Sequence, residues 1–255
     1  MTASVGSLST WTDEDASPAH VVPYTPDYRD AIRRIYAETA FFGGPVETYF
    51  DDRNLFADLG IDTYLDHYPE YAWAAESEGR IVGYIVGCPL GDGQMRRHNL
   101  ARLPHILARL AAGRYRVGRK TLAYLRDQAL AALGGELLEI RSNSYPANLH
   151  INLLPAYRGH GLGAALLRAY LGKLASDGVP GVHAVTTERN EAAVHLYRAF
   201  GFTVIAEATT HAWKRYVGGP LRLIAFGLRL SPDDFAEASA QTPRQARILC
   251  YNDSR

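Results

Sequence analysis

Apolar residues recur with the spacing of an α-helix in several segments of the chain. The clearest stripe consists of Leu166, Leu167, Tyr170, Leu171 and Leu174. Such a stripe predicts an amphipathic helix with one buried face. A second stripe predicts a helix over residues 26–42, with Thr25 as its cap and Pro26 at its first position. A third predicts a helix over residues 191–200 that Gly201 ends.

Shorter apolar runs, alternating or continuous, predict strands. They occupy residues 21–24, 71–76, 80–87, 149–154, 182–187, 203–210 and 221–230. The turn residues Ser77-Glu78-Gly79 join the second and third runs into a hairpin. The break Gly218-Gly219-Pro220 lets the last two runs pair antiparallel. Strands and helices therefore mix along the chain, which predicts an α/β protein.

The segment 88–146 separates two of these strands and is predicted to hold two more helices. Their apolar stripes are Leu100, Leu103, Leu107 and Leu110 in the first, and Leu122, Leu125, Ala129 and Leu133 in the second. We expect these leucines to pack both helices onto the rest of the protein. From Arg96 to Arg126 the segment also carries eight arginines and one lysine, but no aspartate or glutamate. This basic segment is either a solvated helical face or a surface that meets acidic acceptors or cofactor phosphates.

Composition limits the classes that remain. A chain of 255 residues fits one domain, which we place at residues 20–230 between a flexible arm (1–19) and a loosely ordered tail (231–255). The 27 basic side chains equal the 27 acidic ones, which argues against general nucleic-acid or membrane affinity. The two cysteines, Cys88 and Cys250, give neither a disulfide framework nor a metal site. With no secretory or membrane-spanning segment either, we expect a soluble, cytoplasmic protein.

A glycine-rich loop precedes the clearest helix: Arg158-Gly159-His160-Gly161-Leu162-Gly163-Ala164. Glycines let the main chain approach a ligand, and the first turn of a helix offers free N–H groups to phosphate. The same residues fit a dinucleotide fingerprint, with Glu188 on a ribose. However, residues 155–158 intervene between strand and glycine, and a dinucleotide turn has no such spacer.

The pattern Arg-x-x-Gly-x-Gly in this loop resembles the pyrophosphate loop of the GNAT superfamily of acyl-CoA-dependent N-acyltransferases. Asn190-x-x-Ala193-x-x-x-Tyr197-x-x-x-Gly201-Phe202 resembles the second signature of that family. The resemblance implies a mixed, mostly antiparallel sheet of about six to seven strands with helices on both faces. It also implies a splay between the two parallel strands, 149–154 and 182–187, and makes segment 88–146 a helical insertion.

The resemblance further implies a site for acetyl-CoA. The main chains of Leu153 and Leu154 would pair with its pantetheine arm, and Arg158, Gly159, His160, Gly161, Leu162, Gly163 and Ala164 would hold its pyrophosphate. Asn190 would lie near the pantetheine, although a helix cap alone also explains it. Tyr197 would protonate the departing thiolate, although its place on an apolar helical stripe also fits a core residue.

Acetyl transfer to an amine also needs a base, because an amine with a pKa of about 10.4 is protonated at neutral pH. His150 shares one face of its predicted strand with Asn152, which makes it a candidate. Glu188, at the end of the other splayed strand, is a second candidate. A hydrogen-bonded strand histidine and a solvated carboxylate are the respective alternatives.

The run from His150 to Gly163, followed by Gly178-Val-Pro-Gly181-Val-His183, is similar to the acetyltransferase-like domain of O-GlcNAcase and its free-standing bacterial relatives. Some members of that group lack turnover. Two hypotheses therefore stand. The protein is an N-acetyltransferase for a primary amine of a small molecule or a protein, or it binds acetyl-CoA as a sensor or interaction module. Its expected partners are acetyl-CoA and an amine, and a homodimer is left open.

Overall fold

The computed structural model describes residues 19–231, so the predicted arm and tail lie outside it apart from Ala19 and Ser231. Seven strands form one sheet in the order β1-β2-β3-β4-β5-β7-β6. They are β1 (His20–Pro23), β2 (Ala72–Ser77), β3 (Arg80–Cys88), β4 (Ala147–Leu153), β5 (Gly181–Thr187), β6 (Thr203–Thr210) and β7 (Leu221–Arg229). Only β4 and β5 pair in parallel. The predicted fold class is confirmed.

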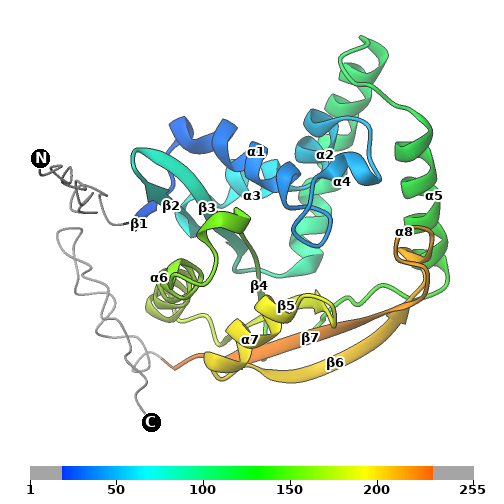
Figure 1. Ribbon diagram of the computed structural model, residues 1–255. Helices are drawn as coiled ribbons and strands as arrows, with labels where there is room; N and C mark the ends of the chain where they lie inside the picture. The colour runs from blue at the N-terminus through cyan, green and yellow to red at the C-terminus, as the bar shows by residue number, and fades with distance from the viewer. Residues whose placement is uncertain (1–18, 232–255) are drawn as a thin grey trace, which may run out of the picture.

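Helices cover both faces of the sheet (Figure 1). On one side lie α1 (Arg29–Glu38), α2 (Arg53–Leu59) and α3 (Ile61–His67), and on the other α6 (Leu162–Ser176) and α7 (Glu191–Ala199). The insertion adds α4 (Asp92–Ala111) and α5 (Arg119–Leu133), and a short helix α8 (Lys214–Val217) precedes β7. Within the described residues, no helix combines the length and apolar character needed to cross a bilayer.

The core between α6 and the sheet follows the predicted stripe. All five of its apolar side chains are buried. The Tyr170 hydroxyl donates a hydrogen bond to the Asn148 carbonyl at 2.5 Å. A Cβ at Gly87 would stand 1.9 Å from that hydroxyl, so this position of β3 admits only glycine. The buried contact fixes α6 beneath β3 and β4.

The two insertion helices form where the sequence predicts them, but the expected packing of their leucines is wrong. Leu100, Leu103, Leu107 and Leu110 of α4, and Leu122, Leu125 and Leu133 of α5, are exposed. The buried side of α4 carries Met95 and Ile106 among polar residues. The helix therefore lies rotated relative to its leucine stripe, and side chains other than leucine hold it.

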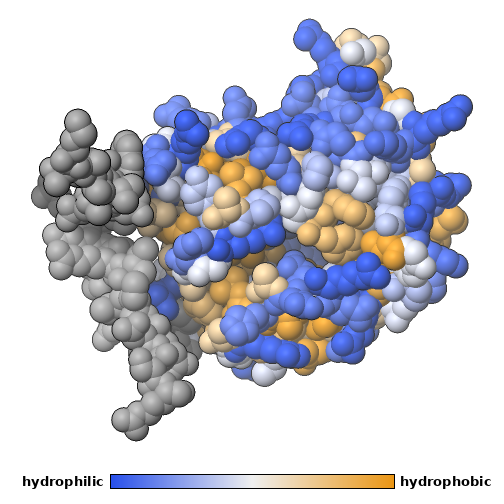
Figure 2. Space-filling model, in the orientation of Figure 1, coloured by the Kyte–Doolittle hydropathy of each residue, from blue (hydrophilic) through white to orange (hydrophobic). Residues whose placement is uncertain are grey.

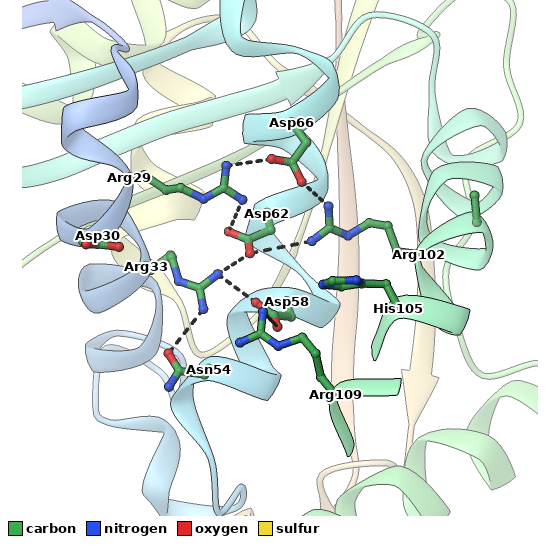
Figure 3. A pocket seen from close by; sticks show the side chains of 11 residues that line it. Arg29, Asp30, Arg33, Asn54, Asp58, Asp62, Asp66, Arg102, His105 and Arg109 are labelled. Atoms are coloured by element: carbon green, nitrogen blue, oxygen red, sulfur yellow. Dashed lines mark hydrogen bonds and ion pairs between the residues drawn. The ribbon is translucent and has the colours of Figure 1, made fainter. Parts of the chain in front are cut away.

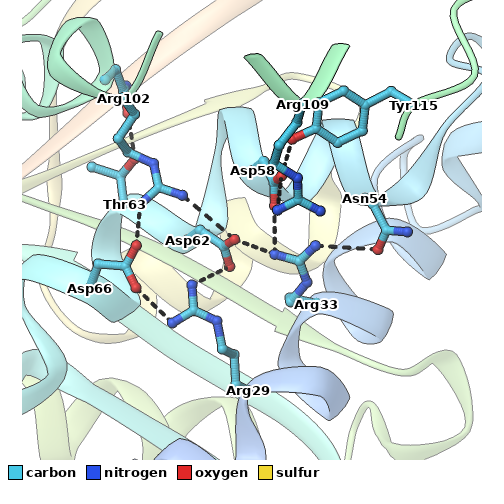
Figure 4. Close-up of polar contacts among 11 residues, drawn as sticks. Arg29, Arg33, Asn54, Asp58, Asp62, Thr63, Asp66, Arg102, Arg109 and Tyr115 are labelled. Carbon is cyan, nitrogen blue, oxygen red and sulfur yellow. Dashed lines mark hydrogen bonds and ion pairs between the residues drawn. The ribbon is translucent and has the colours of Figure 1, made fainter. Parts of the chain in front are cut away.

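Ion pairs hold α4 against α2 and α3 (Figures 3 and 4). Arg102 hydrogen-bonds Asp66 and lies 3.6 Å from Asp62, while Arg109 lies 3.1 Å from Asp58. From the α1 side, Arg33 pairs with both Asp58 and Asp62. Asp58 and Asp62 are each 3% exposed, so a charge on them needs such partners.

This network also corrects the picture of the basic segment. Arg102 and Arg109 are neutralised by carboxylates that lie outside that segment in the sequence. Arg96 pairs with Glu139, and Arg126 with Asp127. The segment is therefore less basic in the folded protein than its own composition suggests.

Candidate functional site

The two parallel strands separate soon after they meet. β4 and β5 pair only at Ala147 with Val182 and at Asn148 with His183. Beyond that point β4 continues along β3 while β5 continues along β7. Figure 2 shows a hollow edged by hydrophobic residues in the middle of this face, where β4 and β5 lie. The predicted splay is thus present, and it leaves one edge of β4 without a strand.

Of the two leucines expected to offer their main chains, Leu153 faces this opening. The N–H of Leu154 donates to the Val82 carbonyl at 2.9 Å, and its carbonyl accepts from Tyr157. Because successive main-chain groups of a strand point to opposite edges, those of Leu153 point away from β3. An extended amide chain could pair with Leu153 as an added strand would.

The glycine loop connects β4 to α6 and faces open space. Gly159 and Gly161 have φ values of 80° and 81°, which favour glycine. No atom lies within 4 Å of where a Cβ would stand at either position. Gly161 is also the N-cap of α6, and no side chain caps that helix. The N-terminus of a 15-residue helix is thus free to bind an anion.

Arg158 brings a positive charge to the loop. Its Nε donates to the Leu153 carbonyl at 3.0 Å, and its guanidinium lies over Gly43. Burial lowers the pKa of Arg158, and no carboxylate between residues 19 and 231 forms an ion pair with it. Two other side chains of the loop differ in exposure: Leu162 is buried in the core, whereas His160 is exposed.

Tyr197 lies in the hydrophobic core cluster that also contains Leu162 and Leu149. It is 4% exposed and packs against Phe202 and Phe226. Burial raises its pKa, so the phenol keeps its proton at neutral pH. The Tyr197 hydroxyl has no hydrogen-bond partner among residues 19–231. It is also not one of the polar atoms that are both unpartnered and completely buried in this part of the chain. The hydroxyl is therefore free to donate to a ligand.

Asn190 and Glu188 flank the start of α7. The Asn190 side chain accepts a hydrogen bond from the Ala193 N–H at 3.2 Å, which confirms the predicted cap. The Glu188 carboxylate is half-exposed and lies 3.4 Å from Arg222 of β7. The structure does not bring Glu188 together with His150, which lies in a separate cavity.

His150 is half-buried, and its ring contacts those of Tyr36 and Tyr84. Its Nδ1 lies 3.0 Å from the Tyr84 hydroxyl, which also accepts from the Asn152 amide at 3.0 Å. If the Tyr84 hydroxyl donates to Nδ1, the Asn152 amide, the Tyr84 hydroxyl and the His150 Nδ1 each have a hydrogen-bond partner. The proton of the neutral His150 ring is then on Nε2. Burial lowers the pKa of His150 to about 4, so the ring is neutral at physiological pH.

A cavity of about 330 Å³ lies beside His150, between β4 and the helices α1, α3 and α4. Its walls are Tyr36, Gly60, Ile61, Tyr64, Asp92, Met95, Arg96, Asn99, Asn148 and His150. It adjoins the last paired residue of β4 before the splay, Asn148. A second cavity, of about 500 Å³, is lined by the ion-pair network of Figure 3, whose arginines and aspartates neutralise one another.

Asp92 is the one carboxylate in the smaller cavity, and sequence reasoning missed it. Its Oδ1 accepts from the Asn148 amide at 2.7 Å and lies 3.3 Å from His183 Nε2. Burial would raise the pKa of Asp92, but the hydrogen bonds of His183 and Asn148 outweigh this and lower it. Its only signal in the sequence is an acidic residue in the first turn of a predicted helix. Its partners lie far along the chain.

His183 and Asp92 hold a charge at the point where the strands part. The Nδ1 of His183 lies 2.8 Å from the Tyr145 carbonyl, which can only accept, so Nδ1 carries a proton. Its Nε2 lies 3.3 Å from the Asp92 carboxylate. The structure thus places an Asp–His pair beside the cavity, with His183 buried and the Asp92 side chain 26% exposed.

Comparisons with known proteins agree with this geometry. The chain matches the model of the Acetyltransferase (GNAT) family over residues 29–202, more than half of its length. The structure of SsHAT is 28% identical, with a TM-score of 0.60 over 84% of this chain and 98% of that one. Two further solved structures have the same fold. Each is 15% identical to this chain, with a TM-score of 0.52, and each covers 84% of it. They are an N-acetyltransferase from Staphylococcus aureus Mu50, covered to 100%, and yncA from Salmonella typhimurium with its cofactor acetyl-CoA, covered to 94%. The chain therefore belongs to the GNAT family of acetyltransferases.

Proposed function

We propose that the protein transfers the acetyl group of acetyl-CoA to a primary amine bound in the cavity beside Asp92. The observation that carries this proposal is the parting of β4 and β5 between an open glycine loop and a polar cavity. The loop 158–164 would hold the pyrophosphate through main-chain N–H groups, with Arg158 adding charge. Leu153 would align the pantetheine, which leads the thioester toward the apex of the splay.

Asp92 suits the ammonium form of the acceptor. Its carboxylate is ionised at neutral pH because its pKa is lowered, and one side of it reaches the cavity. The amine must lose a proton before its nitrogen attacks the thioester carbonyl, and Asp92 is placed to take it. His150 fits this task less well, because its Nδ1 faces the Tyr84 hydroxyl; with that hydroxyl donating, Nε2 carries the proton and can only donate a hydrogen bond. Glu188 is engaged by Arg222.

Tyr197 would complete the reaction. As the C–S bond breaks, charge develops on sulfur, and a neutral phenol without an internal partner can donate its proton there. Asn190, as the cap of α7, would keep that helix and Tyr197 in place. The products are the N-acetylated amine and free coenzyme A: the first amine proton passes through Asp92 to solvent, and the second, lost as the amide forms, restores the proton that Tyr197 gave to sulfur.

Two finer assignments rest on the sequence alone. We keep the similarity of His150–Gly163 to the O-GlcNAcase-like group and the domain limits 20–230 as proposals. The alternative role, in which acetyl-CoA is bound without transfer, is an outcome of the following experiment.

The release of the coenzyme A thiol in the presence of a panel of primary amines tests the proposed function. We expect turnover with at least one amine, and Asp92→Asn should lower kcat/KM by roughly 100-fold or more. Tyr197→Phe should lower kcat in the same assay. Asp127→Asn is the matched control, because Asp127 pairs with Arg126 and Arg215 outside the cavity. Binding of acetyl-CoA without turnover on any amine would support the sensor role instead.

A further inference from the structure

The two helices of the insertion expose an apolar surface. On α4, four leucines are between 38% and 58% exposed, and on α5 four more are between 42% and 86% exposed. We call these eight residues the leucine face: Leu100, Leu103, Leu107, Leu110, Leu122, Leu125, Leu130 and Leu133. In Figure 2, hydrophobic residues reach the surface near the tip of α4 and along the edge where α5 lies. Monomeric soluble proteins rarely leave such a surface uncovered.

The orientation of α4 is fixed, so its leucines cannot turn inward. Arg102 and Arg109, on the side away from Leu100 and Leu107, pair with the aspartates of α2 and α3, and Asn99 at the edge between the two sides bonds to Thr63 (Figure 4). The charged side of this helix thus faces the protein and its apolar side faces outward. This reverses the usual arrangement of an amphipathic surface helix. A second surface is needed to cover the leucines.

The spacing of the leucines indicates what covers them. Leu100, Leu103, Leu107 and Leu110 follow one another at intervals of three, four and three residues. This is the a/d spacing with which one helix packs along another. The small residues Ala108 and Ala111 beside them are exposed, so a second helix can approach closely. A helix with the same leucine repeat would therefore fit against this side of α4.

The sequence of residues 1–18 and 232–255 does not carry this repeat. Together they contain just two leucines, Leu8 and Leu249. In Figure 1 the described chain also begins at β1 and ends after β7 on the side of the molecule away from α5. A second copy of the chain, in contrast, supplies an identical leucine face.

We propose that the protein forms a two-fold dimer in which the leucine faces of two copies pack against each other. In this dimer the two α4 helices run antiparallel across a two-fold axis perpendicular to them, so that the same patch is used on both copies. This brings Arg97 of each copy toward the C-terminal end of the other α4, where a positive charge is favourable. With 20 residues, α4 is about 30 Å long, and α5 adds a second exposed row of leucines over 15 residues.

The contact also bears on the proposed acceptor cavity. Asp92, Met95, Arg96 and Asn99 line that cavity from the N-terminal half of α4. A second copy packed on the outer side of α4 would brace this wall. The dimer itself does not depend on acetyl transfer, so its test needs no activity.

The mass of the full chain in solution, measured by sedimentation equilibrium, tests the dimer. The monomer has a mass of 28.1 kDa, and we expect the wild type to sediment with twice that mass. The double variant Leu103→Glu/Leu107→Glu places two charges in the contact and should weaken self-association by roughly 100-fold or more. Both leucines are exposed in one copy, so the fold should survive, which circular dichroism checks. Val204→Glu, on a β6 residue that is 46% exposed, is the matched control and should remain dimeric.

Three results would overturn the proposal. One is a wild type that stays monomeric at about 100 µM, well above the dissociation constant of a specific interface. Another is a dimer that persists in the double variant, because its contact would lie elsewhere. The third is a monomer that sediments with vesicles of anionic and zwitterionic phospholipid and loses this binding in the double variant, which would make the leucine face a lipid surface.

Discussion

At the scale of single residues, main-chain conformation and burial decide what each candidate can do. Gly159 and Gly161 have positive φ values and face open space, which suits a loop that binds a ligand through its main chain. The motif made this predictable, because glycine spacing is a local property. Asp92 was not predictable, because its partners Asn148 and His183 come from two strands that meet it only in the fold.

The half-buried His150 makes the stability of the fold depend on pH. Burial lowers its pKa from 6.5 to about 4. Between these two pH values the imidazole is therefore protonated in the unfolded chain but neutral in the folded protein. Stability from this residue is therefore complete above pH 6.5 and is lost as pH falls toward 4. The effect is on the order of 3 kcal/mol.

Urea unfolding at pH 7 and at pH 4.5 measures this effect. We expect the free energy of unfolding to fall less between the two pH values in His150→Asn than in the wild type, because asparagine does not titrate. Carboxylates titrate in both proteins and cancel in the difference. An equal fall in the two proteins would mean that His150 is protonated in the folded state at pH 4.5.

At the scale of elements, periodicity predicted which segments are helices but not always which side they bury. For α6 the apolar stripe faces the core, as expected. For α4 the carboxylates of α2 and α3 determine the orientation, since a buried aspartate without a cation costs more than an exposed leucine. The sequence of α4 alone does not show where those carboxylates lie, so it could not predict the orientation of the helix. The N-terminus of α5 depends in the same way on the distant Asp51, which accepts from the N–H groups of Gly118 and Thr121.

Loss of one arginine from this network should loosen α4. Arg102→Gln removes a partner of Asp62 and Asp66, and we expect it to lower the free energy of unfolding by about 1–3 kcal/mol. Arg126→Gln is the control, because that exposed pair with Asp127 should contribute less than about 1 kcal/mol. Hydrogen exchange should rise in α4 for the first variant alone. Equal losses in both variants would show that the network does not anchor the helix.

At the scale of the whole molecule, the sheet joins two sites that the sequence presents separately. The glycine loop and Tyr197 lie on the α6 and α7 side, and the cavity with Asp92 lies on the α1 and α4 side. The parting of β4 and β5 lies between them, where we propose that the thioester and the amine meet. The fold class followed from the strand pattern and the family motif. The proposed acceptor cavity could not be predicted in this way, because it forms between β4 and an insertion whose orientation cannot be read from its own sequence pattern.

Calorimetric titration of acetyl-CoA into the wild type and Gly161→Val tests the central claim, that the loop 158–164 binds the cosubstrate. Valine at φ 81° strains the main chain and places a side chain where the phosphates would lie, with no protein atom within 4 Å to clash. Gly178→Val is the matched control, because Gly178 has φ 70° and open space at the opposite end of α6. The account predicts that Gly161→Val abolishes binding while Gly178→Val binds as the wild type does. Wild-type affinity in a folded Gly161→Val protein would contradict it.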